Sequence, residues 1–185
     1  MQKRRSIKQA KLLASAQSLI HQQGLHKTTL ADIAEDSGVS IGNMYYYFKT
    51  KEDILRAVAG SQVEQFNDMV AAFKTLPSPR ARLAAFIDER TKIAPEVAKW
   101  GCPIGSLIQE IAKYDVDLQD GHNALKARLS WAEQQFSQME VAQPAMFAQR
   151  YVASLQGACL LASTYHDPSI FIEQGEQLKA WLDTL

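Results

Sequence analysis

Three consecutive tyrosines, Tyr45, Tyr46 and Tyr47, are the side chains of this sequence best suited to hydrogen bonding outside a protein core. A phenol joins an apolar ring to a hydroxyl that can pair with a phosphate oxygen or a base edge. Successive residues of a helix point about 100° apart, so three in a row cannot all face one core. We therefore expect at least one phenol to be exposed. The alternative is an ordinary aromatic helix of a globular protein.

The sequence shows few residue spacings that are typical of a catalytic site or a metal site. The sequence has no glycine-rich phosphate loop and no H-E-x-x-H. His21 and His26 are five residues apart and would not share a helix face. We expect no catalytic residue, no cofactor and no metal site, and predict that the protein is not an enzyme.

One cysteine could still be reactive. Cys102 directly precedes a predicted helix, and the N-terminus of a helix lowers the pKa of a thiol. It is therefore either a sensor thiol or a small residue packed beneath a loop. Cys159 falls in the middle of a predicted helix and is expected to be structural. With two cysteines and no secretory or membrane-spanning apolar run, we expect a cytoplasmic protein without a membrane partner.

Two short helices and a turn are predicted to position the tyrosines. Thr29 can cap the first helix, and Gly38 lies where that helix ends and the backbone needs a positive φ. Ser40 is predicted to cap a second helix, which runs to Phe48 and turns Met44 and Phe48 inward. This is a helix-turn-helix, a unit that places its second helix in the major groove of DNA.

The charge distribution supports a nucleic-acid partner, although the net charge is zero. Residues 1–50 hold seven Lys/Arg and three Asp/Glu, a net charge of +4, so residues 51–185 carry −4. A basic segment around a helix-turn-helix attracts phosphate. Residues 2–5 (Gln-Lys-Arg-Arg) would form a basic arm that contacts the DNA backbone or minor groove.

The sequence from Gly42 to Leu55 resembles the G-x-x-Y-x-x-F-x-x-K-x-x-L signature of the TetR family of bacterial transcriptional regulators, and the resemblance extends over about residues 6–58. It implies phosphate contacts by Thr29, Ser40, Tyr45, Tyr47, Lys49 and Lys51. We expect Asn43 and Tyr46 to read base edges, with Ile41 and Gly42 allowing close approach.

Helical periodicity and the absence of strand alternation predict an all-α fold of about nine helices. Residues 1–50 would be a three-helix DNA-binding domain, and residues 51–185 a helical effector-binding and dimerisation domain. A long helix over about residues 51–74 would link them. The helix that starts at Pro79 should break or kink at Pro95.

An effector pocket is expected among mixed apolar and polar side chains of the second domain, although plain packing would explain most of them. The candidates are Met69, Phe73, Phe86, Trp100, Cys102, Ser106, Gln109, Tyr114, Trp131, Gln135 and Phe136. The Gly-Cys-Pro-Ile-Gly-Ser-Leu segment from Gly101 to Leu107 is similar to that of a TetR subgroup with members that respond to electrophiles or oxidants.

The last two helices are predicted to pair across a two-fold axis, because one has a face of small residues and the other ends the chain with apolar positions uncovered. The expected interface is Ala153, Ser154, Gly157, Ala158, Leu161, Phe171, Leu178, Trp181 and Leu182. The alternative is that both helices close their own subunit core.

The predicted function is therefore a homodimeric regulator, most simply a repressor of a pseudo-palindromic operator. A small molecule or a thiol-reactive effector would release it. The alternative class is a helical protein–protein interaction module that binds no specific DNA sequence.

Overall fold

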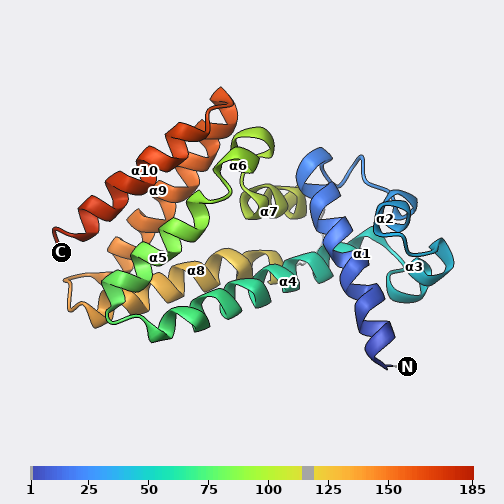
Figure 1. Cartoon of the computed structure of the whole chain (residues 1–185), viewed down its shortest axis with the longest axis horizontal. Helices are drawn as coiled ribbons and strands as arrows, with labels where there is room; N and C mark the ends of the chain where they lie inside the picture. The colour runs from blue at the N-terminus through green and yellow to red at the C-terminus, as the bar shows by residue number, and fades with distance from the viewer. Residues whose placement is uncertain (1, 114–118) are drawn as a thin grey trace. The chain divides into compact units, whose positions relative to one another are not determined.

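The computed structural model describes the backbone of residues 2–113 and 119–185 and the side chains of residues 7–112 and 123–185. Over these ranges the chain forms ten α-helices and a short 3-10 helix, with no strand among them (Figure 1). The predicted all-α fold is confirmed. The break at Pro95 separates α5 (Pro79–Thr91) from α6 (Ala94–Trp100), because proline cannot continue a preceding helix, and this accounts for the additional helix.

The chain packs as two compact units. The first contains residues 1–62 and 106–122, and the second contains residues 63–105 and 123–185. Two helices, α4 (Lys51–Ala72) and α7 (Pro103–Lys113), contribute residues to both units. The start of α4 belongs to the first unit because Ile54, Leu55 and Val58 are buried in its core. That residue 50 separates the two functions stays a prediction.

The first unit is built from α1 (Gln2–Gln23), α2 (Leu30–Ser37), α3 (Ile41–Tyr47) and the start of α4. The backbone of residues 2–5 is helical rather than an extended arm, because α1 begins at Gln2. The core takes one face of each helix and is completed by two residues of α7; its members include Leu12, Ala16, Ile20, Ile33, Met44, Phe48, Leu55, Leu107 and Ile111.

Side-chain caps fix the two turns of this unit. Thr29 caps α2 as predicted, and Asp32 completes a capping box: the Asp32 N–H donates to Thr29 Oγ1 at 3.1 Å, and the Thr29 N–H donates to Asp32 Oδ2 at 2.8 Å. Gly38 ends α2 at φ +65°, a conformation that glycine adopts without strain. Before α4, Asp53 Oδ2 accepts from the N–H groups of Lys49 and Thr50.

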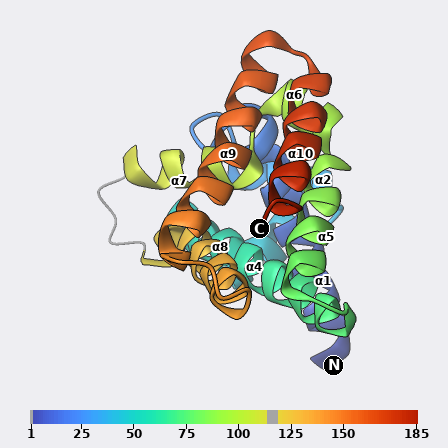
Figure 2. The same ribbon diagram turned by 90° about the vertical axis from the view of Figure 1, so that its left-hand side faces the viewer.

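The second unit is a helical layer around α9 (Pro144–Tyr165). This helix packs against α10 (Pro168–Leu182) and α6, and α10 also packs against α5 (Figures 1 and 2). The Tyr151 hydroxyl of α9 donates to the Leu83 carbonyl of α5 at 2.7 Å. The remaining elements are the end of α4, a 3-10 turn (Phe73–Thr75) and α8 (Gln119–Gln138).

Ring contacts run through the core of the second unit. Phe66, Phe86 and Trp131 lie within 6.0 Å of one another between ring centroids, and a second group follows around Phe136 and Trp181. Gly175 is required where α10 meets α5, because a Cβ there would come within 2.8 Å of Thr91 Cγ2. Within the described residues, no helix is both long and apolar enough to cross a bilayer.

Candidate nucleic-acid interface and internal pocket

Helix α3 has one buried face and one exposed face. Met44 and the C-cap residue Phe48 are buried in the core of the first unit. On the other side, the exposed fractions of Ile41, Tyr45 and Tyr46 are 44%, 53% and 60%. Large apolar side chains exposed together on a short helix indicate a partner surface.

Tyr47 and Tyr46 are held differently. Tyr47 is half-buried and packs against the core, whereas the Tyr46 ring meets the Tyr47 ring edge-to-face at 5.2 Å between centroids. The core therefore supports the first ring, and the first ring supports the second. This arrangement pre-orients an exposed phenol at little further cost in side-chain entropy.

The polar residue of the exposed face is held by its own helix. Asn43 Nδ2 donates to Ser40 Oγ at 2.7 Å, and Asn43 is only half-exposed. The predicted cap by Ser40 is wrong in detail, because its hydroxyl makes no hydrogen bond to the backbone of α3. The hydroxyl orients Asn43 instead.

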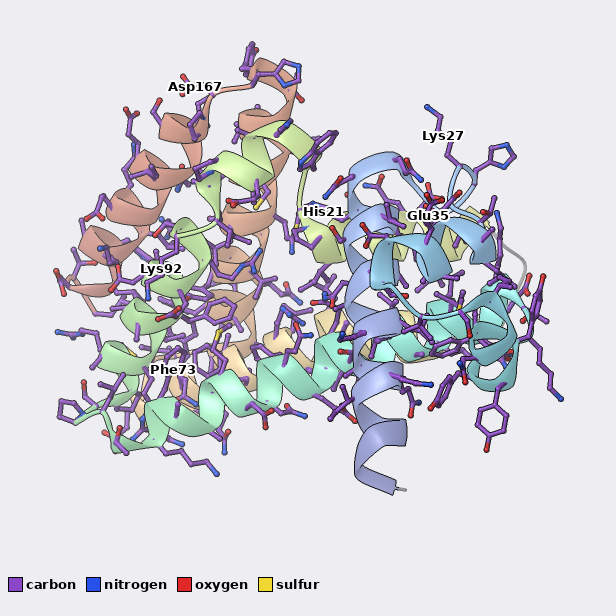
Figure 3. The ribbon with its side chains drawn as sticks, turned by 45° about the vertical axis from the view of Figure 1, so that its right-hand side comes forward. His21, Lys27, Glu35, Phe73, Lys92 and Asp167 are labelled. Atoms are coloured by element: carbon purple, nitrogen blue, oxygen red, sulfur yellow. The ribbon has the colours of Figure 1, made fainter. Side chains whose placement is uncertain are left out.

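Basic side chains border this face. Lys49 is exposed, while Lys51 Nζ donates to the carbonyls of Leu25 at 3.2 Å and His26 at 3.3 Å. These bonds tie α4 to the turn after α1, and an ammonium group retains a third N–H. Lys27 extends away from the same turn (Figure 3). Sequence reasoning did not single out Lys27, although it lies two residues before the predicted cap Thr29.

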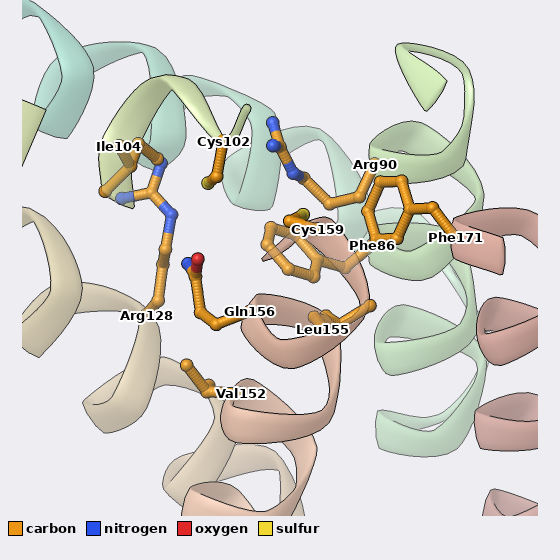
Figure 4. Close-up of a pocket in the computed structure, with 10 residues that line it drawn as sticks. All are labelled: Phe86, Arg90, Cys102, Ile104, Arg128, Val152, Leu155, Gln156, Cys159 and Phe171. Carbon is orange, nitrogen blue, oxygen red and sulfur yellow. The ribbon is translucent and has the colours of Figure 1, made fainter. Parts of the chain in front are cut away.

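The second unit contains an internal cavity of about 20 Å³, which is room for about one water molecule. Its walls come from α5, α8, α9, α10 and the start of α7 (Figure 4). The lining residues are Phe86, Arg90, Cys102, Ile104, Arg128, Val152, Leu155, Gln156, Cys159 and Phe171. In the view of Figure 4, Arg90 and Arg128 lie on either side of Cys102.

Cys102 stands at the N-terminus of α7, where its sulfur accepts from the Gly105 N–H at 3.5 Å. A hydrogen bond from the Cys159 thiol lowers the pKa of Cys102 well below its ordinary value, with smaller contributions from Arg90 and from the N–H groups at the start of α7, while burial opposes the shift. The same bond raises the pKa of Cys159, which keeps its proton. Cys159 is thus the partner of Cys102 and not only a packing residue.

The two arginines of the cavity have few hydrogen-bond partners for their guanidinium groups. Arg128 is 7% exposed, its Nη1 donates to the Ala124 carbonyl at 2.6 Å, and its guanidinium lies 4.6 Å from the Phe66 ring centroid. Burial, followed by the charge of Arg90, lowers the pKa of Arg128 to about 10, so it is still charged at pH 7. Arg90 Nη2 is buried and has no hydrogen-bond partner among the described residues.

Of the predicted effector residues, the structure places only Phe86 and Cys102 at this cavity. Phe73, Trp131 and Phe136 contact other rings instead, and Gln135 is buried with its amide bonded to Arg82 and to the Trp131 carbonyl. The rest do not line it either: Met69 is half-buried, Trp100 is 37% exposed, Ser106 and Gln109 belong to the first unit, and Tyr114 lies outside the described residues.

The predicted dimer surface needs correction. Ala158, Phe171, Leu178 and Leu182 are buried within their own unit, because the apolar face of α10 packs on α5, α6 and α9. Trp181 stacks on Phe147 at 5.7 Å between centroids. Ala153, Gly157 and Leu161 are exposed on α9, and Ser154 is half-exposed.

Sequence reasoning missed Arg90, Arg128, Gln156 and Cys159 as a group. A signal was present: Arg90 lies four residues after Phe86 and three after Ile87, on the apolar stripe of its helix. Arg128 likewise falls four residues before the buried Ala132. A cation at an inward-facing position indicates either a buried partner or a ligand site.

Residues 12–58 match the family model of the bacterial regulatory proteins of the tetR family. An uncharacterized HTH-type transcriptional regulator in the lacX 3' region of Lactococcus lactis subsp. lactis is 26% identical over 176 residues, which cover 91% of this chain and 90% of that one. The curated relatives are transcriptional regulators and not enzymes.

Solved structures share the fold. The regulatory protein TetR from Rhodobacter sphaeroides superposes with a TM-score of 0.82 at 20% identity, covering 94% of this chain and 98% of that chain. FadR from Bacillus subtilis, solved in complex with stearoyl-CoA, gives a TM-score of 0.74 at 19% identity, covering 94% and 96%. Residues 12–58 thus match the helix-turn-helix region of the TetR family of bacterial regulators, and nearly the whole chain shares the fold of solved regulators of that family.

Proposed function

We propose that this regulator is a homodimeric repressor of a pseudo-palindromic operator, released by a small molecule or a thiol-reactive effector, and that it acts in the cytoplasm. The observation that supports the DNA-reading part best is the exposed face of α3, which carries Ile41, Tyr45 and Tyr46 over a buried Met44. An exposed, firmly anchored second helix suits insertion into a major groove.

Within this face, Asn43 and Tyr46 are proposed to read base edges. Gly42 supports the proposal, because a Cβ at this position would meet no atom within 4 Å, so the fold itself has no need of glycine there. A close partner surface would explain the residue. Phosphate contacts are proposed for Thr29, Ser40, Tyr45, Tyr47, Lys49 and Lys51.

The homodimer is proposed to form through an exposed stripe of α9. Met146, Leu160 and Leu161 are 53%, 65% and 49% exposed, and the exposed residues Ala153 and Gly157 lie between them at helical spacing. Small residues between larger apolar ones allow two helices to approach closely. The proposed surface excludes Phe171, Leu178 and Leu182 of α10, because these side chains are buried within their own unit.

The effector is proposed to act through α4. This helix contributes buried residues to both units, Leu55 to the first and Phe66 to the second. A shift of α4 would change the separation of two reading helices, which must lie about 34–36 Å apart to enter successive major grooves. A coupling free energy of about 1–3 kcal/mol is sufficient for such regulation. The complex of FadR with stearoyl-CoA is an example of a regulator of this fold that binds an organic molecule.

Selection of bound fragments from random DNA tests the core of the proposal. We expect a two-fold symmetric consensus with half-sites about one helical turn apart. An asymmetric or absent consensus would contradict a dimeric reader. If the protein binds no DNA even at low salt, the protein–protein interaction module becomes the better reading.

Two substitutions separate base reading from phosphate contact. Asn43→Ala should relax the preference at one or two base pairs, at a cost of about 1–3 kcal/mol in specific binding. Lys51→Ala should weaken all sequences alike and reduce the salt slope by about one. Binding isotherms on the consensus and on scrambled DNA, at several salt concentrations, measure both. Equal losses on both DNAs for Asn43→Ala would contradict its role.

Leu161→Asp tests the dimer surface. A charge in the stripe of α9 should convert the dimer to monomers in analytical ultracentrifugation and weaken operator binding. Ala71→Asp is the matched control, because Ala71 is exposed on α4, outside the stripe. A dimer that withstands Leu161→Asp would place the interface elsewhere.

A thiol-reactive effector is kept as a second candidate because Cys102 has a lowered pKa and a neighbouring thiol in Cys159. The reaction rate with a maleimide, with and without operator, tests it. Reaction at Cys102 with loss of DNA binding, abolished in Cys102→Ser, is the expected result. An inert thiol would eliminate this class of effector and leave the small molecule.

A further inference from the structure

The cavity of the second unit has an excess of positive charge. Its described lining includes two guanidinium groups, Arg90 and Arg128, and no Asp or Glu. The lining also includes the thiol of Cys102, whose sulfur accepts a hydrogen bond from the Gly105 N–H. Two guanidinium groups therefore face a largely buried space whose described lining holds no carboxylate.

Such an arrangement is costly in the absence of a ligand. Burial of a charge without a full set of partners destabilises a protein, and natural chains avoid it unless the charge has a use. Arg90 Nη2 is buried and unpartnered among the described residues, so the two N–H groups of this nitrogen remain to be satisfied at the cavity. Arg128 spends one N–H on the Ala124 carbonyl, and a guanidinium has five.

The remaining walls are apolar. Phe86, Ile104, Val152, Leu155 and Phe171 surround the charged groups, and Gln156 adds an amide (Figure 4). Guanidinium groups match the two oxygens of a carboxylate, whereas these walls suit a hydrocarbon chain.

From these contacts we infer that the cavity is a binding site for an organic monocarboxylate: the carboxylate lies between Arg90 and Arg128, and the apolar tail packs against Phe86, Ile104 and Phe171. The inference rests on the proposed effector-responsive function and names the chemical class of the effector. The cavity of about 20 Å³ is smaller than such a ligand, so binding has to displace wall residues. This repacking gives the ligand a preference between two states of the unit, as an effector requires.

Calorimetric titration of the full chain with acetate, butyrate and octanoate, and with octanamide as the uncharged analogue, tests the inference. We expect octanoate to bind at least tenfold tighter than acetate, because of its tail, and at least tenfold tighter than octanamide, because of its charge. Equal affinities for octanoate and octanamide would overturn the carboxylate site. Equal heats from sodium chloride and octanoate would overturn it in favour of an inorganic anion.

Variants assign the charge to particular residues. Arg90→Met and Arg128→Met should each weaken octanoate binding at least tenfold, whereas Arg128→Lys keeps the charge and should weaken it less. Arg56→Met is the matched control, because Arg56 is exposed on α4, and it should leave binding unchanged. Wild-type affinity in both methionine variants would overturn the inference. If Arg128→Met does not fold, Arg90→Met and Arg128→Lys still decide.

The melting temperature without ligand distinguishes a ligand site from a structural charge. Arg90→Met should melt at or above the wild-type temperature, since it removes a guanidinium nitrogen, Nη2, that is buried without a hydrogen-bond partner among the described residues, and should lose the stabilisation given by octanoate. A marked fall in the melting temperature together with retained octanoate stabilisation would overturn the inference.

Operator binding in the presence of octanoate separates this inference from the proposed function. Octanoate binding that depends on both arginines but leaves operator affinity unchanged supports the site and contradicts the effector role. Release of the operator by other molecules, with no octanoate binding, supports the effector-responsive function and overturns the monocarboxylate site.

Discussion

Helix α3, the proposed reading helix, and the cavity of the second unit present their side chains in opposite ways. In α3, Tyr45 and Tyr46 are more than half exposed, and the helix is held by a buried Met44. Around the cavity, Arg128 and Cys102 are at most 9% exposed, and the space holds about one water molecule. One surface is formed before its partner arrives, whereas the other site has to be opened.

This difference determines how the binding free energy of each partner is used. A preformed surface loses little side-chain entropy on binding, so DNA affinity should follow the contacts that are made. In a small and charged cavity, part of the ligand's binding free energy is needed to move the wall residues. This movement is what changes the state of the protein. A substitution at α3 should therefore change DNA binding without changing ligand binding at the cavity, and a substitution at the cavity should do the reverse. We expect exceptions only where a substitution destabilises a whole unit.

The largest expected effect comes from Met44→Ala, which removes the anchor of α3. Met44 is fully buried, so the cavity should cost about 2–5 kcal/mol of the free energy of unfolding of the first unit and abolish operator binding. The three tryptophans, Trp100, Trp131 and Trp181, all belong to the second unit. The unfolding transition followed by their fluorescence should therefore keep its midpoint denaturant concentration. An equal shift of the tryptophan transition would break the comparison.

Gly175→Ala is the corresponding test in the second unit. The new methyl group would meet Thr91 Cγ2 at 2.8 Å and Ile87 Cγ2 at 3.1 Å, so overpacking should cost about 1–3 kcal/mol of stability. Denaturant unfolding followed by tryptophan fluorescence measures the loss. Gly60→Ala on α4, followed by far-UV circular dichroism because Gly60 belongs to the first unit, is the control: a Cβ there meets nothing within 4 Å, and alanine should raise stability by up to about 1 kcal/mol. Destabilisation by both would refute the packing argument.

Gly42→Ala should separate stability from DNA binding. Its Cβ would project into open space, so alanine should increase the free energy of unfolding by up to about 1 kcal/mol through helix propensity. Operator affinity should nevertheless fall, because the methyl group separates α3 from the groove. Thermal unfolding and DNA titration on the same preparation measure both. Unchanged operator affinity would show that residue 42 does not approach the DNA.

The smallest expected effect is a loss of stability of the first unit in acid. Hydrogen bonds from the Thr29 backbone N–H and hydroxyl hold the pKa of Asp32 below its usual value, and the Lys49 N–H does the same for the pKa of Asp53. These carboxylates stabilise the fold fully above their unfolded pKa of about 3.9, and this stabilisation is lost as the pH falls through the lower folded pKa. The protection factors of residues 29–33 against amide hydrogen exchange should therefore fall in acid, and less steeply in Asp32→Asn. Parallel pH profiles of the two proteins would contradict the assignment.

The sequence predicted local features better than distant pairings. The cap by Thr29 and the positive φ of Gly38 follow from the sequence, because a cap depends on residues within about three positions. The burial of Met44 and Phe48 followed from a four-residue spacing. The Ser40–Asn43 bond was not predicted, because Ser40 can equally serve the backbone or a neighbouring side chain.

The cavity could not be assembled from the sequence. Arg90, Cys102, Arg128 and Cys159 come from four separate segments, and no periodic pattern states which helix faces meet. The prediction of a dimer surface on the apolar face of α10 fails for the same reason: periodicity shows that Phe171 and Leu178 are covered, but not which element covers them. The structure shows α5, α6 and α9 as the cover.

The division of α3 into an anchoring and a presenting face also bears on how such a regulator can diversify. Ile41, Tyr45 and Tyr46 have little role in the core, whereas the frame depends on Met44, Phe48 and the carboxylate of Asp53. Mutations on the presenting face can therefore accumulate at almost no cost in folding. A gene duplicate could acquire a new target sequence by changing a few exposed side chains while inheriting an intact scaffold.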